Sequence, residues 1–147
     1  VITVRYRAEI RVNVADQLGK VEGKLPMGFR RDVVWPGIVF AGGTGNPYFS
    51  TDTAAVLRAI EMEADVLIKA TKVAGVFSAD PHKDPDAEFY PRLTFMDVMT
   101  RELNVMDAAA VSLCRENRLP IVVLNINEQG AMASALRGDA RGTLVSG

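Results

Sequence analysis

Two nearly continuous apolar runs, at 64–69 and 120–125, constrain the fold of this chain more than any other feature. Such runs are typical of strands that are covered on both faces, whereas a strand with one wet face alternates. From residue 38 they alternate with segments of helical spacing. We expect strands near 38–41, 64–69, 120–125 and 143–146, and helices near 51–62, 94–101, 105–117 and 129–137. This alternation predicts an α/β fold, a three-layer α/β/α sandwich with a mostly parallel sheet.

The first 37 residues follow a different pattern. Apolar residues alternate from Ile2 to Val14, which predicts one long half-buried strand or two shorter ones. Residues 19–37 are rich in glycine and proline and have the composition of a loop. We therefore divide the chain into a strand-and-loop segment, 1–37, and an α/β part, 38–147.

The composition excludes several classes of protein. No apolar run approaches the ~20 residues that span a bilayer, and no signal-peptide pattern opens the chain, so we expect a soluble protein without a membrane partner. The net charge is −1, and no basic patch is interleaved with aromatic residues, which argues against nucleic acid binding. A single cysteine, Cys114, excludes an intrachain disulfide and fits a reducing compartment. Its helical spacing with Ala110 and Leu113 favours the core over a nucleophile.

A glycine-rich segment joins the first α/β strand to the first helix. Residues 42–52 read Gly-Gly-Thr-Gly-Asn-Pro-Tyr-Phe-Ser-Thr-Asp. A turn of this kind at a helix N-terminus directs backbone N–H groups toward an anion. Thr44, Asn46, Ser50 and Thr51 add side-chain hydrogen-bonding groups. The segment therefore predicts a site for a phosphorylated small molecule, with a metal ion nearby.

Two charged residues stand where phosphate chemistry would need them. Lys69 ends an apolar strand, and an ammonium there neutralises charge on transferring phosphate oxygens. Asp52 lies in the first helical turn, where it orients a lysine, holds Mg²⁺, or only stabilises the helix dipole. Since ligands of α/β folds bind at the carboxyl ends of strands, the loops after 41 and 69 should face one crevice. Lys72 is either part of that site or a solvated surface lysine.

Four blocks of this sequence together resemble the bacterial UMP kinases of the amino-acid-kinase superfamily. They are Gly42–Asp52, then Ala64–Val73 with Gly75–Pro81, then Val105–Asp107, and finally Gly142–Val145. The resemblance covers about residues 38–147, which correspond to the C-terminal half of the family, so the fold should be incomplete on its N-terminal side. Residues 1–37 have no family match and lack two phosphate-handling elements of the family. Ala74 stands where the family usually has aspartate.

The resemblance implies roles for particular residues. Asp52 and Lys69 would be catalytic. The loop would bind UMP through Thr44, Gly45, Asn46, Pro47, Tyr48, Phe49, Ser50 and Thr51. ATP would contact Thr71, Phe77 and Asp80, with Phe77 against the adenine and Asp80 near the ribose or ring edge. The residues alone would equally make Phe77 a core residue and Asp80 a turn former before Pro81. Asp107 would be linked to nucleotide response and subunit organisation, or would only cap a helix. No metal ion held by the protein itself is expected.

The resemblance also implies an activity. It is the ATP-dependent, Mg²⁺-requiring phosphorylation of UMP to UDP in pyrimidine nucleotide biosynthesis, by a cytoplasmic homohexamer that GTP activates and UTP inhibits. The alternative is a non-catalytic nucleotide-binding fragment that lacks the N-terminal half of the phosphate site. A third reading, a superfamily kinase for an amino acid or carbamate, is disfavoured by the loop at 44–49.

Overall fold

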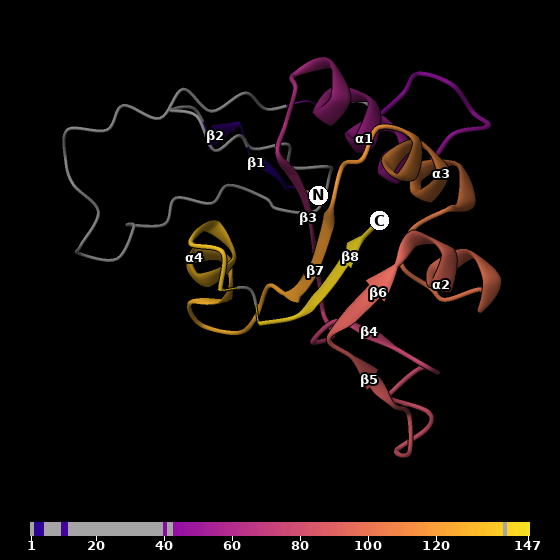
Figure 1. Ribbon diagram of the computed structural model, residues 1–147, viewed down its shortest axis with the longest axis vertical. Coiled ribbons are helices and arrows are strands. Elements are labelled where there is room, and N and C mark those ends of the chain that lie inside the picture. Colours follow the sequence, from indigo (N-terminus) through magenta and orange to yellow (C-terminus); the bar gives the residue numbers. More distant parts are fainter. Residues whose placement is uncertain (1, 5–9, 12–39, 41–42, 140) are drawn as a thin grey trace, which may run out of the picture.

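The computed structural model describes residues 2–4, 10–11, 40, 43–139 and 141–147. Its main element is a sheet of six strands flanked by helices (Figure 1). In spatial order the strands are β2 (Ile10–Arg11), β1 (Ile2–Val4), β3 (Val66–Thr71), β7 (Ile121–Asn125), β8 (Thr143–Ser146) and β6 (Arg92–Thr94). A second, two-stranded sheet consists of β4 (Val76–Phe77) and β5 (Phe89–Tyr90), which form the β4–β5 hairpin, residues 76–90.

The pairings give the sheet its direction. β3 and β7 are parallel, as are β6 and β8. β8 runs antiparallel to β7, and β1 runs antiparallel to both β2 and β3. The parallel β3–β7 pair forms the centre of the sheet, and its five paired positions run from Leu67↔Ile121 to Thr71↔Asn125.

Helices cover both faces of this sheet. The helices are α1 (Thr51–Glu61), α2 (Phe95–Thr100), α3 (Ala108–Glu116) and α4 (Ala131–Leu136). In Figure 1, α4 lies to the left of the sheet and the other three lie to its right. Two apolar cores match this division: Leu67 and Ile121 pack toward α1 and α3, while Ile68 and Leu124 pack toward α4. The predicted α/β sandwich is therefore confirmed.

The four predicted helices and three of the predicted strands are confirmed: the strand at 143–146 has the predicted bounds, and the other elements have shifted ends. β3 continues to Thr71, so the prediction that Lys69 ends this strand is wrong. β3 begins at Val66 because a turn closes α1: the Ala64 N–H donates to the Ala59 carbonyl, and Glu63 has a φ of 52°. α3 begins three residues later than predicted because Asp107 caps it and accepts from the Ala110 N–H at 2.9 Å. Local capping, which periodicity does not resolve, fixed these ends.

Other strands were missed or lie outside the described residues. β4, β5 and β6 were not predicted, because strands of two or three residues are too short for an alternation to be recognised. The strand predicted at 38–41 lies outside the described residues apart from Phe40, which belongs to no strand. Within 2–14 the described residues form two short strands, one of the two readings offered above.

The N-terminal segment contributes to the main sheet, because β1 pairs with β3 from Ile2↔Ile68 to Val4↔Val66. The division of the chain between residues 37 and 38 stays a prediction. Among the described residues, no helix combines the length and apolar character that a membrane crossing requires.

Candidate functional site

The loop that precedes α1 folds on its own polar side chains. The Thr44 hydroxyl accepts from the Asn46 N–H at 3.0 Å, and the Asn46 side-chain oxygen accepts from the Tyr48 N–H at 2.9 Å. Gly43 and Gly45 adopt φ values of 64° and 69°, which residues with a side chain rarely adopt. The sequence therefore specifies this loop locally, through two glycines and two side-chain turns.

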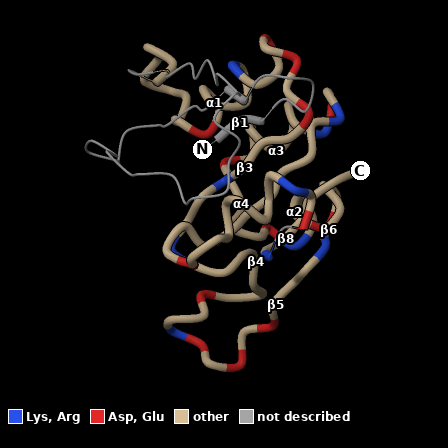
Figure 2. Tube along the Cα trace, turned by 90° about the vertical axis from the view of Figure 1, so that its left-hand side faces the viewer, with Lys and Arg blue, Asp and Glu red and all other residues tan. Residues whose placement is uncertain are grey.

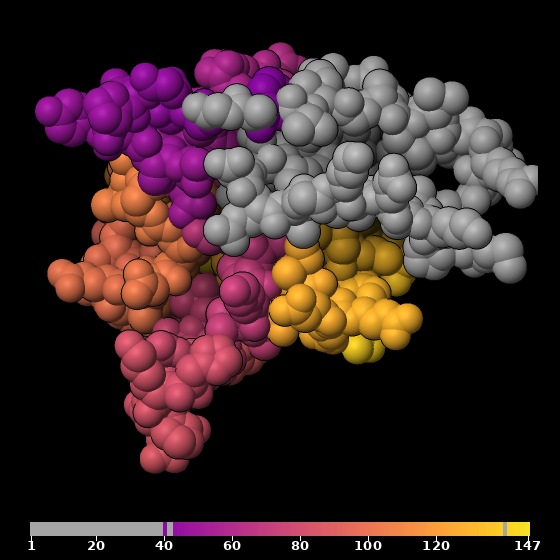
Figure 3. Space-filling view, turned by 180° about the vertical axis from the view of Figure 1, so that it is seen from behind, coloured from indigo at the N-terminus to yellow at the C-terminus, as the bar shows by residue number. Residues whose placement is uncertain are grey.

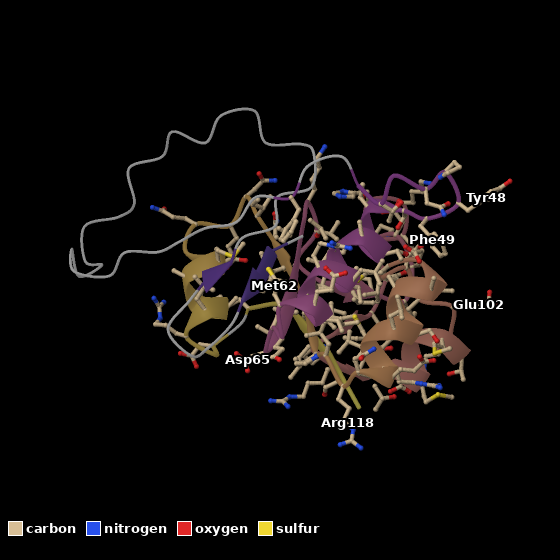
Figure 4. All side chains as sticks on the ribbon, turned by 90° about the horizontal axis from the view of Figure 1, so that it is seen from above. Tyr48, Phe49, Met62, Asp65, Glu102 and Arg118 are labelled. Atoms are coloured by element: carbon tan, nitrogen blue, oxygen red, sulfur yellow. The ribbon has the colours of Figure 1, made fainter. Side chains whose placement is uncertain are left out.

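The loop presents aromatic rings to solvent. Tyr48 is 93% exposed and Phe49 is 49% exposed, and Figure 4 shows both beyond the end of α1. Large exposed apolar side chains that gather in one loop are a feature of binding surfaces. The predicted UMP-binding residues thus lie together on a surface that a ligand can reach.

Three side chains join the N-termini of two helices. Ser50 caps α1 and accepts from the N–H groups of Asp52 and Thr53. The Ser50 hydroxyl donates to one carboxylate oxygen of Asp107, and the Thr53 hydroxyl donates to the other at 3.0 Å. Asp107 at the same time caps α3 through the Ala110 N–H. We refer to Ser50, Thr53 and Asp107 as the α1–α3 junction; it fixes the end of the loop against α3.

The surroundings of Asp107 favour its charged form. Burial raises the pKa of Asp107, but hydrogen bonds from Ser50, the Ala110 N–H and Thr53 together lower it more, so this pKa lies below the ordinary value of 3.8. The positive ends of two helix dipoles also face this carboxylate. Asp107 is therefore ionised at neutral pH, and its role as a helix cap is confirmed.

The structure brings together the two residues predicted to be catalytic. The Lys69 ammonium lies 2.5 Å from a carboxylate oxygen of Asp52, and the two side chains are 23% and 20% exposed. Because side chains alternate along β3, Lys69 points to the same face as Leu67, toward α1, and Asp52 lies in the first turn of that helix. The pair is thus held between the central strand and the helix that follows the loop.

The residues predicted to bind ATP lie on or before the β4–β5 hairpin. The ring of Phe77 packs against Phe89 with centroids 5.3 Å apart. Asp80 accepts from the His82 N–H at 3.0 Å and lies 3.8 Å from the Lys83 ammonium, so it does form a turn. At the end of β3, the Thr71 hydroxyl donates to the Val73 carbonyl at 2.8 Å. These contacts are structural, and the roles of the three residues toward ATP stay predictions.

The two groups of predicted ligand contacts are not adjacent. In Figures 1 and 2 the hairpin projects at the lower end of the molecule, whereas α1 lies near the upper end. The structure therefore joins Asp52 to Lys69 and Ser50 to Asp107, but it does not bring the loop at 43–50 to Phe77 or Asp80.

Two threonines with evident structural roles were not predicted. Thr53 is 2% exposed and donates to Asp107, and Thr143 is fully buried and contacts both strands of the hairpin. A signal for Thr53 was present: it is a hydroxyl on the buried face of α1, among alanines. Thr143 stands in the last of the four blocks, which the sequence singled out without giving it a role.

The single cysteine lies in the apolar core between the sheet and its helices. Cys114 is fully buried, and burial raises the pKa of its thiol to about 12, so its prediction as a core residue is confirmed. Among the residues that the structure describes, no three His, Cys, Asp or Glu side chains are grouped so as to hold a metal ion.

The fold is that of an α/β protein, and its glycine-rich loop, helix N-terminus and paired lysine have the chemistry that suits an anionic ligand. The model of the Amino acid kinase family matches residues 28–125. The chain therefore belongs to the amino acid kinase family.

Two curated relatives of this chain are uridylate kinases. The chain is 57% identical over 109 residues to a uridylate kinase from Yersinia enterocolitica, covering 74% of this chain and 44% of that protein. It is 55% identical over 109 residues to a uridylate kinase from Vibrio vulnificus, with 74% and 45% covered. The chain thus spans less than half the length of these relatives.

Solved structures agree with this placement. The fold is similar to that of the UMP kinase from Bacillus anthracis, with a TM-score of 0.72, 40% identity, and 75% of this chain and 46% of that chain covered. For the UMP kinase from Ureaplasma parvum the TM-score is 0.69 and the identity 38%, with 76% and 48% covered. The resemblance to UMP kinases is therefore confirmed, for part of their length.

Proposed function

We propose that this chain carries the UMP loop and the lysine–aspartate pair of a UMP kinase, which transfers the γ-phosphoryl group of ATP to UMP and yields UDP and ADP. The observation that carries the proposal is the 2.5 Å contact of Lys69 with Asp52, directly after the loop that the resemblance assigns to UMP. The similarity to uridylate kinases of two organisms supports the same assignment.

UMP would bind in the loop that runs from Thr44 to Thr51. Backbone N–H groups before the N-terminus of α1 suit its phosphate, and the polar side chains suit its uracil edge. A wrong base would leave buried donors and acceptors unpaired, which is how such sites discriminate. The exposed rings of Tyr48 and Phe49 offer apolar surface beside these groups.

Lys69 would neutralise charge that develops on the phosphoryl group in transfer, since electrostatic stabilisation dominates reactions of this class. Asp52 would hold the Lys69 ammonium in place, as it does in the structure. ATP would contact Thr71, Phe77 and Asp80. Its Mg²⁺ would arrive with the phosphates of the substrate, and Asp52 would hold it directly or through water.

Further parts of the proposal rest on the resemblance alone. They are a homohexameric assembly, activation by GTP, inhibition by UTP, a place in pyrimidine nucleotide biosynthesis and a cytoplasmic location. For Asp107, we propose a role in nucleotide response in addition to its cap, because it anchors the end of the UMP loop.

The second candidate is a nucleotide-binding fragment that holds UMP or ATP without catalysing transfer. It is favoured by one observation, that the chain spans 44–45% of the length of its uridylate kinase relatives. A reaction that needs phosphate contacts from the rest of such a protein would then not proceed on these 147 residues alone.

The test is UMP-dependent release of ADP from Mg-ATP by the 147-residue chain, with Asp52→Asn beside it. We expect Asp52→Asn to abolish turnover while the urea midpoint changes little. The matched control is Glu61→Gln, which makes the same change on the same helix at an exposed ion pair with Arg58 and should leave turnover intact.

Three outcomes distinguish the candidates. Turnover that is lost only in Asp52→Asn supports the kinase. UMP binding without turnover in a folded chain supports the nucleotide-binding fragment. If the folded chain binds neither UMP nor Mg-ATP, both candidates are wrong.

A further inference from the structure

Thr143 is the first residue of β8, and no step of the proposed reaction uses it. Its side chain is fully buried, which is unusual for a threonine unless its hydroxyl is hydrogen-bonded. It belongs to the closing block of the sequence, Gly142–Val145.

The Thr143 hydroxyl bridges the two strands of the β4–β5 hairpin. It accepts from the Val76 N–H in β4 at 2.8 Å and donates to the Tyr90 carbonyl in β5 at 2.6 Å. Val76 and Tyr90 are directly paired with each other. One hydroxyl of the main sheet therefore closes the hairpin at its base, where both strands leave the body of the protein.

Gly75 makes room for this hydroxyl. A Cβ atom at position 75 would lie 2.5 Å from the Thr143 hydroxyl oxygen, 3.0 Å from its backbone nitrogen and 2.9 Å from the ring of Phe89. No real Cβ atom makes the first of these contacts, so a side chain here would displace Thr143. The glycine of one sequence block and the threonine of another thus fit a single contact.

The hairpin depends on such contacts because it is not part of the large sheet. In the space-filling view of Figure 3 it projects from the lower end of the molecule. On the β5 side it is also tied to β8 by the Leu144 N–H, which donates to the Pro91 carbonyl at 3.0 Å. On the β4 side, the Thr143 hydroxyl makes the hydrogen bond that links Val76 to β8.

We propose that Thr143 is a positioning residue for the nucleoside triphosphate: by closing the hairpin base it sets the orientation of Phe77 and Asp80. Phe77 directly follows Val76 in β4, and Asp80 opens the turn beyond it. This inference rests on the proposed function for the assignment of these two residues to ATP. It adds a residue that acts through the hairpin and touches neither nucleotide.

The substitution that isolates the hydroxyl is Thr143→Val. Valine has nearly the same shape but leaves the Val76 N–H and the Tyr90 carbonyl without their buried partner, which disfavours the closed hairpin base. Thr143→Ser keeps the hydroxyl and is the conservative rescue. Thr53→Val is the matched control, since it removes another buried threonine hydroxyl, at the α1–α3 junction.

The experiment measures the binding of UMP and of a non-hydrolysable ATP analogue with Mg²⁺ to the full chain by calorimetry. For Thr143→Val we expect about tenfold weaker binding of the ATP analogue, with UMP binding within about twofold of the unchanged chain. Thr143→Ser should recover most of the loss. Thr53→Val should show the reverse preference and weaken UMP.

Amide hydrogen exchange supplies a readout that needs no ligand. In Thr143→Val, the Ser78 N–H, which donates to Glu88 across the hairpin, should lose about tenfold more protection than the amides of β7. In the unchanged chain, the Val76 N–H should be protected as strongly as β7 amides. This last measurement stands even if Thr143→Val does not fold.

The outcomes separate this inference from the proposed function. If the unchanged chain binds neither nucleotide, the proposed function is wrong, and hydrogen exchange alone decides whether Thr143 closes the hairpin. Equal weakening of UMP and ATP binding, failure of Thr143→Ser to recover binding, or uniform loss of amide protection would each overturn the inference, as would rapid exchange at Val76 in the unchanged chain.

Discussion

The α1–α3 junction and the base of the β4–β5 hairpin both fix one segment of the chain against another, but they do so with different chemistry. At the junction, the ionised carboxylate of Asp107 receives two hydroxyls and a helix N-terminus, and it is partly exposed. At the hairpin base, a neutral hydroxyl in a fully buried position holds two strands, beside a glycine that leaves no spare room. The first contact should respond to pH and charge, and the second to volume and to unpaired buried groups.

The largest loss of stability is expected where a new side chain would overlap the backbone of a neighbouring strand. A Cβ atom at Gly142 would lie 2.1 Å from the Val123 carbonyl oxygen of β7. Gly142→Ala therefore has to separate β8 from β7, and we expect a loss of unfolding free energy of about 3 kcal/mol or more, at or beyond the upper end for overpacking. Urea denaturation measures this loss.

Gly147→Ala is the control for that experiment, because its Cβ atom would meet Phe95 at an ordinary 3.6 Å. A Gly142→Ala chain as stable as Gly147→Ala would show that β7 and β8 can move apart, and would contradict the expectation that this contact leaves no room for a side chain.

The next effect concerns the junction. Thr53→Val removes a donor to Asp107 while keeping the shape of a buried side chain. Since a hydrogen bond to a charged group contributes about 1.5–3 kcal/mol, we expect the unfolding free energy to fall by about that amount, and Thr53→Ser to recover part of it. A loss below 0.5 kcal/mol, as an order-of-magnitude threshold, would mean that Ser50 alone sustains the junction.

The pH dependence of stability should distinguish the α1–α3 junction from the hairpin base. The pKa of Asp107 is lower in the folded chain than its ordinary value of 3.8, so the unfolded chain binds the proton more readily. Its contribution to stability is therefore complete above 3.8 and is lost as the pH falls through the lowered pKa. The measurement is the urea midpoint over a range of about pH 6 to 2. As the pH falls, this midpoint should decrease more steeply in the unchanged chain than in Asp107→Asn.

Asp107→Asn suits this comparison because asparagine is also a good N-cap, so the helix start is retained while the charge is removed. Thr143→Val is the comparison at the hairpin base, where the contact is uncharged. Its urea midpoint should change with pH in parallel with that of the unchanged chain. Parallel curves for Asp107→Asn instead would mean that the junction does not depend on charge.

The smallest effect is expected on the outer surface of α1. Glu61→Gln breaks an ion pair with Arg58 at 2.8 Å, but the two side chains remain 40% (Arg58) and 53% (Glu61) exposed to solvent. Such a pair on a helix contributes about 0.3–0.5 kcal/mol, so the urea midpoint should barely move. A loss of stability comparable to that of Thr53→Val would mean that burial does not determine how much these contacts contribute to stability.

Much of the fold was predictable because its signals are local and repeated. The helix at 51–61 has a cap, a first-turn acid and apolar spacing within its own residues, and β7 is a single buried run. The same holds for the loop at 43–50, where two glycines and two side-chain turns specify the backbone. Strands of two or three residues carry no such repeat, which is why β4, β5 and β6 were missed.

The site divides in the same way. The sequence by itself determined which chemistry is present: a glycine-rich loop, an acid in the first turn of the helix that follows it, and a lysine in the next apolar strand. Only the tertiary structure decided that Lys69 meets Asp52, that Thr53 meets Asp107, and that Thr143 closes the hairpin. These contacts join residues 17, 54 and 67 positions apart, and they depend on how helices and strands pack rather than on any pattern within one segment.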